Sequence, residues 1–232
     1  MTDNSVDILA DTITQTHDVL AERLATAIAC RPTRERPRDR LAATDPFLAS
    51  ASRHVSAANA VLAPTARRHL AHGHRRAQEF AHESRRLEVA LAQVKGKLYG
   101  STFVVRRPWS SIWEEVEDAL GQFRALEERM ADDLVATEAG PDTDELAERL
   151  YRAEQRVPTR PHPYLPHQGL RGRVARRIAV RVDQFWDTAE GRMVPEPVRP
   201  HRSREGRMAQ YLLADPHGVP APASSGKRHR AG

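Results

Sequence analysis

The chain has 232 residues, of which 40% are hydrophobic, only 5% are aromatic and one is a cysteine. A single cysteine, Cys30, excludes an internal disulfide and a zinc site built from several cysteines. No run approaches the roughly 18 apolar residues that span a bilayer, and the acidic, amphipathic first residues lack the pattern of a secretory signal. The sequence therefore predicts a cytoplasmic protein without membrane contact.

The formal net charge of +5 is concentrated at the C-terminal end of the chain. Residues 195–232 hold seven Lys or Arg and three acidic residues, a net +4, which leaves +1 for the other 194 residues. Six prolines, four glycines and no sustained apolar period predict a disordered basic tail there. We expect this tail to make weak contact with nucleic acid or another anionic surface. The nearly neutral remainder argues against a basic folded face for nucleic acid.

The first predicted helix covers residues 5–29. Its apolar residues recur at helical spacing, and His17 lies in the same stripe. The stripe consists of Leu9, Ile13, Leu20, Leu24 and Ile28. Residues 31–40, RPTRERPRDR, hold two prolines and five arginines and predict a linker.

A second helix is predicted to begin at Thr44 or Asp45, because the following Pro46 favours the first turn of a helix. Pro64 is expected to kink or end this helix. Its inward face is formed by Phe47, Ala51, His54, Ala58 and Val61.

Two longer amphipathic helices follow. One is predicted from just after Gly73 to about Leu98, and the other from Trp109 or Ser110 to a stop near residues 140–144. The stripe of the first is Phe80, Leu87, Leu91, Val94 and Leu98, and that of the second is Ile112, Val116, Ala119, Phe123, Leu126, Met130 and Leu134.

The remaining predicted elements are a short fifth helix over about residues 142–156, a proline-rich crossover and a sixth helix over about residues 170–190. The pattern predicts an all-α fold, with an antiparallel four-helix bundle in residues 1–137. One or two additional helices in residues 138–194 are expected to pack on the bundle, ahead of the tail at 195–232.

Three short segments resemble a known family. THDVLAERL, HVSAANAVLAP and FRALEERMADDL place His17, His54 and Glu127, respectively, on their predicted helices. Together they resemble the hemerythrin-like (HHE) proteins over about residues 5–137. The resemblance implies a bundle in which histidines and carboxylates project into the core and enclose two irons.

The chain departs from the family pattern at several ligand positions. Ala58 stands where the second-helix carboxylate is expected, and Phe123 stands where the fourth-helix histidine is expected. On the third helix, the apolar stripe places Phe80 and Ser84 in the ligand positions and turns His82 roughly 150° away from the stripe. None of the four substituted side chains binds iron strongly, so we expect no family-type di-iron centre.

Two interpretations of function follow. In the first, the chain is a non-enzymatic binding or regulatory module with an eroded di-iron site, no catalytic residue and no cofactor, and its tail contacts a protein partner of unknown identity. In the second, His17, His54 and Glu127 form a residual metal site that holds one iron and senses oxygen, peroxide or nitric oxide, as the resemblance implies.

The same three residues also have structural interpretations that the sequence leaves open. His17 and His54 can form a hydrogen-bonded polar pair in the core without any metal. Glu127 can pair with an arginine such as Arg124, Arg129 or one from the sixth helix.

Overall fold

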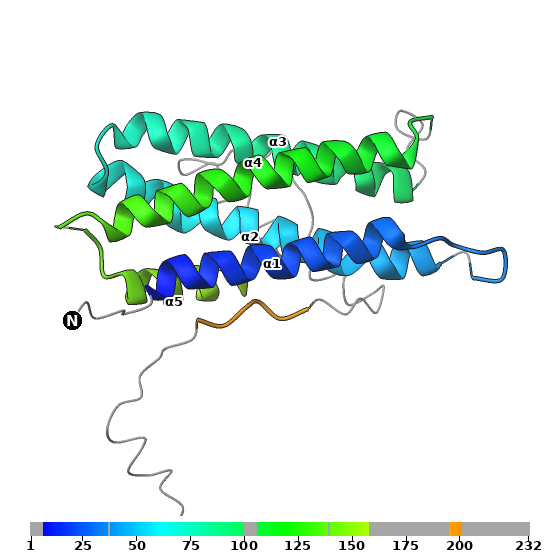
Figure 1. The fold of residues 1–232 in the computed structure, drawn as a ribbon, viewed down its shortest axis with the longest axis horizontal. Helices are drawn as coiled ribbons and strands as arrows, with labels where there is room; N and C mark the ends of the chain where they lie inside the picture. The colour runs from blue at the N-terminus through cyan, green and yellow to red at the C-terminus, as the bar shows by residue number, and fades with distance from the viewer. Residues whose placement is uncertain (1–6, 37, 100–105, 139, 158–194, 201–232) are drawn as a thin grey trace, which may run out of the picture. The chain divides into compact units, whose positions relative to one another are not determined.

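The computed structural model describes residues 7–36, 38–99, 106–138, 140–157 and 195–200. Within these ranges the chain forms five helices and no strand (Figure 1). The helices are α1 (Ile8–Ala29), α2 (Asp39–His69), α3 (Gly73–Leu98), α4 (Trp109–Val135) and α5 (Thr143–Glu154). None of these helices, across the part of the chain that the structure describes, combines the length and apolarity needed to cross a membrane.

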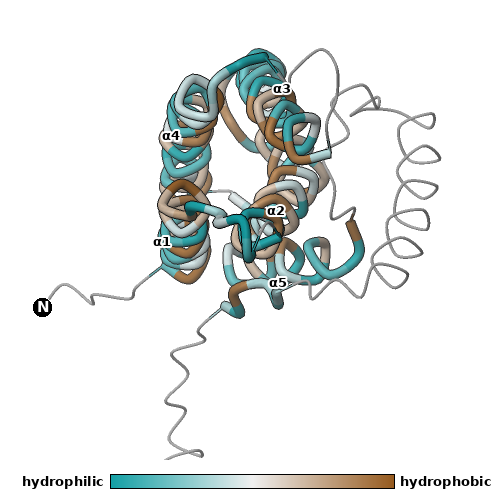
Figure 2. Tube along the Cα trace, turned by 90° about the vertical axis from the view of Figure 1, so that its right-hand side faces the viewer, coloured by the Kyte–Doolittle hydropathy of each residue, from teal (hydrophilic) through white to brown (hydrophobic). Residues whose placement is uncertain are grey.

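The helices pack around a shared apolar interior. Seen nearly end-on in Figure 2, α1, α2, α3 and α4 surround this interior, and α5 lies beside α2. Helix α2 contacts each of the other four helices, and α5 packs against both α1 and α2. The largest fully buried side chains come from all five helices, and three of them are Phe47, Phe80 and Phe123.

Two helices begin at aspartate caps that the local sequence supplies. The carboxylate of Asp7 accepts hydrogen bonds from the backbone nitrogens of Leu9 and Ala10, at 3.0 and 3.3 Å. The carboxylate of Asp142 accepts one from the backbone nitrogen of Glu145 at 2.9 Å. Each cap satisfies a donor that the helix itself cannot pair, which fixes where α1 and α5 begin.

The predicted start of the second helix was wrong, and Pro64 does not end the helix. Helix α2 begins at Asp39 rather than at Thr44 or Asp45, and it continues through Pro46 and Pro64 to His69. A proline inside a helix removes one hydrogen bond and costs about 3 kcal/mol. Buried side chains on both sides of each proline offset this cost: Thr44, Phe47 and Leu48 flank the first, and Leu62, Thr65 and Ala66 flank the second.

The third helix was predicted to begin just after Gly73, and α3 begins at Gly73 itself. His72 just before it adopts the left-handed conformation, with φ of 54°. A Cβ atom at position 73 would overlap the carbonyl oxygen of Ala66, so α2 and α3 approach closely only because glycine stands there. The predicted end of α3 at Leu98 and the start of α4 at Trp109 are confirmed.

The predicted crossover and sixth helix, residues 158–194, lie outside the described residues, as do residues 201–232 of the predicted tail. Residues 195–200 are described and contact α2 and α5. The carbonyl oxygen of Pro195 accepts a hydrogen bond from Arg53, and the Nε of Arg199 donates to the Tyr151 hydroxyl at 2.9 Å.

Candidate metal centre

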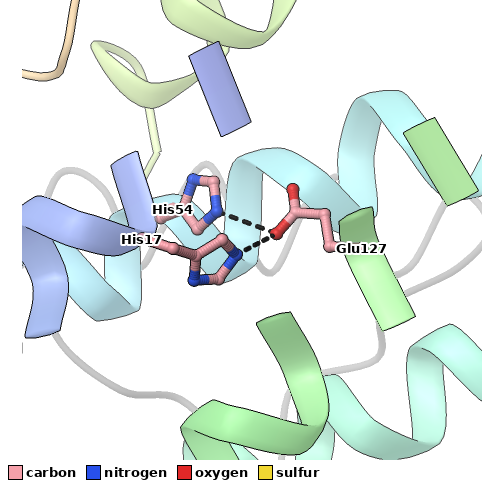
Figure 3. Close-up of side chains that lie close together, drawn as sticks. All are labelled: His17, His54 and Glu127. Atoms are coloured by element: carbon pink, nitrogen blue, oxygen red, sulfur yellow. Dashed lines mark hydrogen bonds and ion pairs between the residues drawn. The ribbon is translucent and has the colours of Figure 1, made fainter. Parts of the chain in front are cut away.

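Three polar side chains from three helices meet in the interior. Nε2 of His17 on α1 and Nε2 of His54 on α2 each lie 2.9 Å from Oε2 of Glu127 on α4 (Figure 3). All three residues are at most 1% exposed. The predicted positions of His17 and His54 on the apolar faces of their helices are therefore confirmed, and Glu127 lies beside both in the interior.

The helical spacing of each segment explains why these side chains meet. His17 stands four residues after Ile13, His54 three after Ala51, and Glu127 four after Phe123. Residues three or four apart share one face of a helix, so each polar residue continues the apolar stripe of its own helix into the core.

Glu154 is a fourth member of the cluster. Its Oε1 lies 2.7 Å from Nδ1 of His54, and the residue is 5% exposed. It belongs to α5, where it continues the stripe of Leu146 and Leu150 at four-residue steps. Glu154 was not predicted as a site residue, although its spacing of four residues from Leu150 indicates that it lies on the buried face of the helix.

His54 and Glu127 each shift the pKa of the other. Burial by itself lowers the pKa of His54, but the charge of Glu127 and hydrogen bonds with Glu127 and Glu154 outweigh it and raise that pKa to about 10. Burial raises the pKa of Glu127, but the charge of His54 and hydrogen bonds from His17 and His54 lower it to about 2. Both shifts favour a protonated His54 beside an ionised Glu127 in the metal-free protein.

Two polar atoms of the cluster have no hydrogen-bond partner among the described residues. They are Nδ1 of His17 and Oε1 of Glu127, and both are buried. His54 uses both ring nitrogens and Glu127 accepts two bonds on one oxygen, so the hydrogen bonding is concentrated on one side of the cluster.

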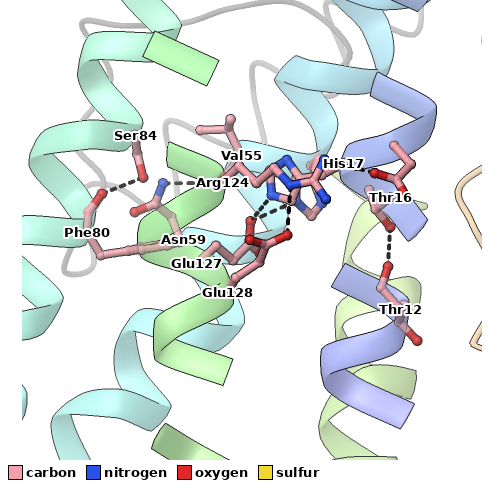
Figure 4. Close-up of polar contacts among 12 residues, drawn as sticks. Thr12, Thr16, His17, Val55, Asn59, Phe80, Ser84, Arg124, Glu127 and Glu128 are labelled. Carbon is pink, nitrogen blue, oxygen red and sulfur yellow. Dashed lines mark hydrogen bonds and ion pairs between the residues drawn. The ribbon is translucent and has the colours of Figure 1, made fainter. Parts of the chain in front are cut away.

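The other side of the cluster is apolar. The ring centroid of Phe123 lies 5.8 Å from that of His17 and 6.1 Å from that of His54, and Phe80 packs 5.2 Å beyond it. Figure 4 shows Ser84 turned back to donate to the carbonyl oxygen of Phe80, at 2.7 Å. Aromatic rings thus occupy this side of the cluster.

The predicted buried face of the third helix is confirmed. Phe80 and Ser84 are fully buried, whereas the side chain of His82 is 78% exposed. Ala58, which was predicted on the inward face of the second helix, is also fully buried.

The suggestion that Glu127 pairs with an arginine is not borne out among the described residues, because its two partners are the histidines. Arg124 instead donates to Glu128 at 2.7 Å and to Asp18 at 2.8 Å, on the surface of α1 and α4. Burial explains the difference: Glu127 points into the core and Glu128 is partly exposed.

The donor set fits one transition-metal ion. One ligand atom from each of His17, His54 and Glu127 lies within 4.8 Å of the other two. Two imidazole nitrogens and one carboxylate oxygen suit iron, zinc and related ions. The second nitrogen of His54 is held by a carboxylate, as is usual for metal-bound histidine, whereas Nδ1 of His17 has no such partner among the described residues.

Comparison of this chain with protein-family models, with curated proteins and with solved structures gives no match in any of the three. The function is therefore inferred from the residues of the site themselves.

Proposed function

We propose that the protein is a non-enzymatic, hemerythrin-like helical bundle in which a binuclear centre has been reduced to a site for a single metal ion. In this proposal α1 to α4 form the antiparallel four-helix bundle, and the reduced centre serves a binding or regulatory role. The tail at residues 201–232 provides the contact with a protein partner.

The observation that carries the proposal is the convergence of His17, His54 and Glu127 on one buried point, with Glu154 behind His54. Burial of this many ionisable groups is costly unless they are paired or bind a metal. Phe123 lies against both histidines and Phe80 lies behind it, so the cluster offers ligands for one metal ion rather than two.

The chemistry of the proposed site is that of three protein ligands and open coordination positions. When bound, a ferrous ion supplies positions at which a small oxidant or a diatomic gas can bind. His17, His54 and Glu127 would hold the ion, and Glu154 would keep His54 in the orientation that directs Nε2 toward it. The apolar rings of Phe80 and Phe123 would exclude water from one side.

A second candidate function is favoured by the direct contact between His54 and Glu127. Their 2.9 Å hydrogen bond and opposite charges stabilise the cluster without any metal. In this form the polar core is a structural feature, and the protein acts only through its surface and its tail.

Metal content separates these candidates. After purification with and without oxygen, we expect at most one equivalent of iron or another transition metal per chain. Titration of the purified protein with Co²⁺ should saturate near one equivalent. Glu127→Gln should lose this binding, because an amide oxygen is a poorer ligand than a carboxylate. Glu128→Gln is the matched control, since this neighbour pairs with Arg124 at the surface.

Two irons per chain with an oxo-bridged spectrum would contradict the single-metal proposal. Absence of binding for every transition metal tested would favour the metal-free candidate instead.

A further inference from the structure

A second concave site lies away from the polar cluster. It has a volume of about 340 Å³ and is formed by the C-terminal end of α1, the first turn of α2 and the first turns of α4. Its lining residues are Ile28, Arg31, Arg40, Trp109, Ser110, Trp113, Glu114 and Glu117. A volume of this size holds a small organic molecule.

Aromatic and cationic groups are stacked in one wall of the pocket. The rings of Trp109 and Trp113 lie nearly parallel, with centroids 5.5 Å apart and an interplanar angle of 21°. The guanidinium carbon of Arg40 lies 4.6 Å from the centroid of Trp109. This cation–π contact holds the Arg40 side chain in place without using its N–H donors.

The donors of Arg40 are available to a ligand. Among the described residues, its guanidinium makes no ion pair and no hydrogen bond, although the side chain is partly buried. Burial lowers the pKa of Arg40, the nearby Cys30 opposes this effect, and the charge of Arg31 lowers the pKa again. Two guanidinium groups that repel one another at a pocket are stabilised when an anion binds between them.

The start of α4 adds to the positive potential. Trp109 and Ser110 form its first turn, which contains no acidic residue, and Pro108 before it provides no side-chain cap. In contrast, Asp7 and Asp142 cap α1 and α5. The unpaired N–H groups of a helix start attract negative charge.

The remaining lining residues restrict the ligand. Glu114 and Glu117 are exposed carboxylates on the same pocket, so a polyanion would be repelled. Ile28 and Trp113 offer apolar surface to an uncharged part of the ligand. The lining therefore favours a molecule with one negative charge and an apolar body.

We propose that this pocket binds a small organic acid, with its single carboxylate at Arg31 and Arg40 and its apolar body against Ile28 and the tryptophans. This site is independent of the metal proposal, because it shares no residue with the polar cluster.

The test uses the full chain and fluorine NMR of ligand resonances. Fluorobenzoate should bind saturably at constant ionic strength. Fluorobenzyl alcohol, which lacks the charge, and fluorophenyl phosphate, which carries a second one, should each bind at least about tenfold more weakly. Acetate should fail to displace fluorobenzoate, because it lacks the apolar body.

Variants locate the site. Arg40→Gln and Arg31→Gln should each weaken fluorobenzoate binding about tenfold or more, the loss expected for a charge-assisted hydrogen bond. Arg34→Gln, which removes an exposed arginine outside the pocket, should change it less than about twofold. Arg31 is exposed, so its variant tests the proposal even where Arg40→Gln disturbs folding.

Three results would overturn the proposal. The first is that fluorobenzoate does not bind saturably. The second is that the uncharged alcohol or the phosphate binds as tightly as fluorobenzoate. The third is that the Arg31, Arg40 and Arg34 variants bind fluorobenzoate with equal affinity.

Discussion

His54 links the two carboxylates of the polar cluster, because each of its ring nitrogens contacts a different one. Glu127 lies at Nε2 and Glu154 at Nδ1, at 2.9 and 2.7 Å. Both contacts favour the charged ring, and both are shielded from water. The protonation state of this one residue therefore influences the stability of the whole core.

The pH dependence of the free energy of unfolding of the metal-free protein should reveal the contribution of protonated His54. The folded pKa of His54, about 10, is above the unfolded value of 6.5, so its stabilising contribution is complete below pH 6.5 and is lost as the pH rises toward 10. Glu127, with a folded pKa of about 2, contributes above pH 4.5 and loses its contribution as the pH falls. In chelator-treated protein, the free energy of unfolding from urea titrations should fall by on the order of 1 kcal/mol per pH unit above about pH 7.

Removing one carboxylate provides the control. Glu154→Gln takes away a group that raises the pKa of His54, so the alkaline loss of stability should become smaller. Glu148→Gln, on the same helix and paired with Arg152, should keep the wild-type slope. Identical slopes for wild type and Glu154→Gln would show that His54 is not the group responsible.

Helical periodicity was sufficient to predict His17 and His54 as inward-facing residues, since each lies in the apolar stripe of a long helix. Glu127 lies outside the stripe predicted for its helix, and only the family resemblance singled it out. The partners of Glu127 were not predictable in the same way. The rotation of a helix fixes which face is buried, whereas the nearest group on another helix depends on how the helices pack. Glu154 shows the same limit, because its contact with His54 joins residues 100 positions apart.

At the scale of elements, α2 is the central helix, and it is also the one whose local signals conflict with its structure. Pro46 and Pro64 are both typical boundary residues, yet the helix runs through them. Hydroxyl groups near each proline bond to carbonyl oxygens one turn earlier: Ser50 donates to Pro46 at 2.8 Å and Thr65 donates to Val61 at 2.7 Å. Tertiary burial, which no local window of sequence contains, outweighs the local preference.

Pro64→Ala should therefore stabilise the protein. Pro64 is exposed, so alanine loses little packing there, and it restores a backbone donor for the carbonyl of Ala60. The gain, measured by urea unfolding, should be about 1–2 kcal/mol after the greater flexibility of the unfolded chain is subtracted.

Pro32→Ala is the comparison for this prediction, because Pro32 is exposed and lies outside the helices. It should leave stability unchanged or slightly lower. A loss of stability in Pro64→Ala as large as in Pro32→Ala would mean that the proline fits α2 without strain.

At the scale of the whole molecule, α5 and residues 195–200 form an outer layer on α2. Arg53, one residue before His54, is only 6% exposed and donates to the carbonyl oxygen of Pro195. Burial lowers the pKa of Arg53, while the carboxylates of Glu154 and Glu196 counter this effect. Residues 195–200 were predicted as part of the tail because they are rich in proline and lack an apolar period. A contact made through a backbone carbonyl, such as that of Pro195, leaves no such pattern in the sequence.

The contribution of this segment can be measured by comparing chains that end at residue 194 and at residue 200. The shorter chain lacks Pro195 and Arg199, so the buried guanidinium of Arg53 loses its carbonyl acceptor and Tyr151 loses its donor. We expect the shorter chain to be less stable by about 1–3 kcal/mol, the usual cost of leaving a buried polar group without a partner.

Replacing Arg53 by methionine in both chains is the control, because it removes the buried guanidinium. The difference in stability between the two lengths should then shrink to the part that Arg199 contributes. Equal stability of the two chains with Arg53 intact would show that residues 195–200 add nothing to the folded core. If the two lengths still differ by the same free energy of unfolding when Arg53 is methionine, the effect belongs to Arg199 and Tyr151.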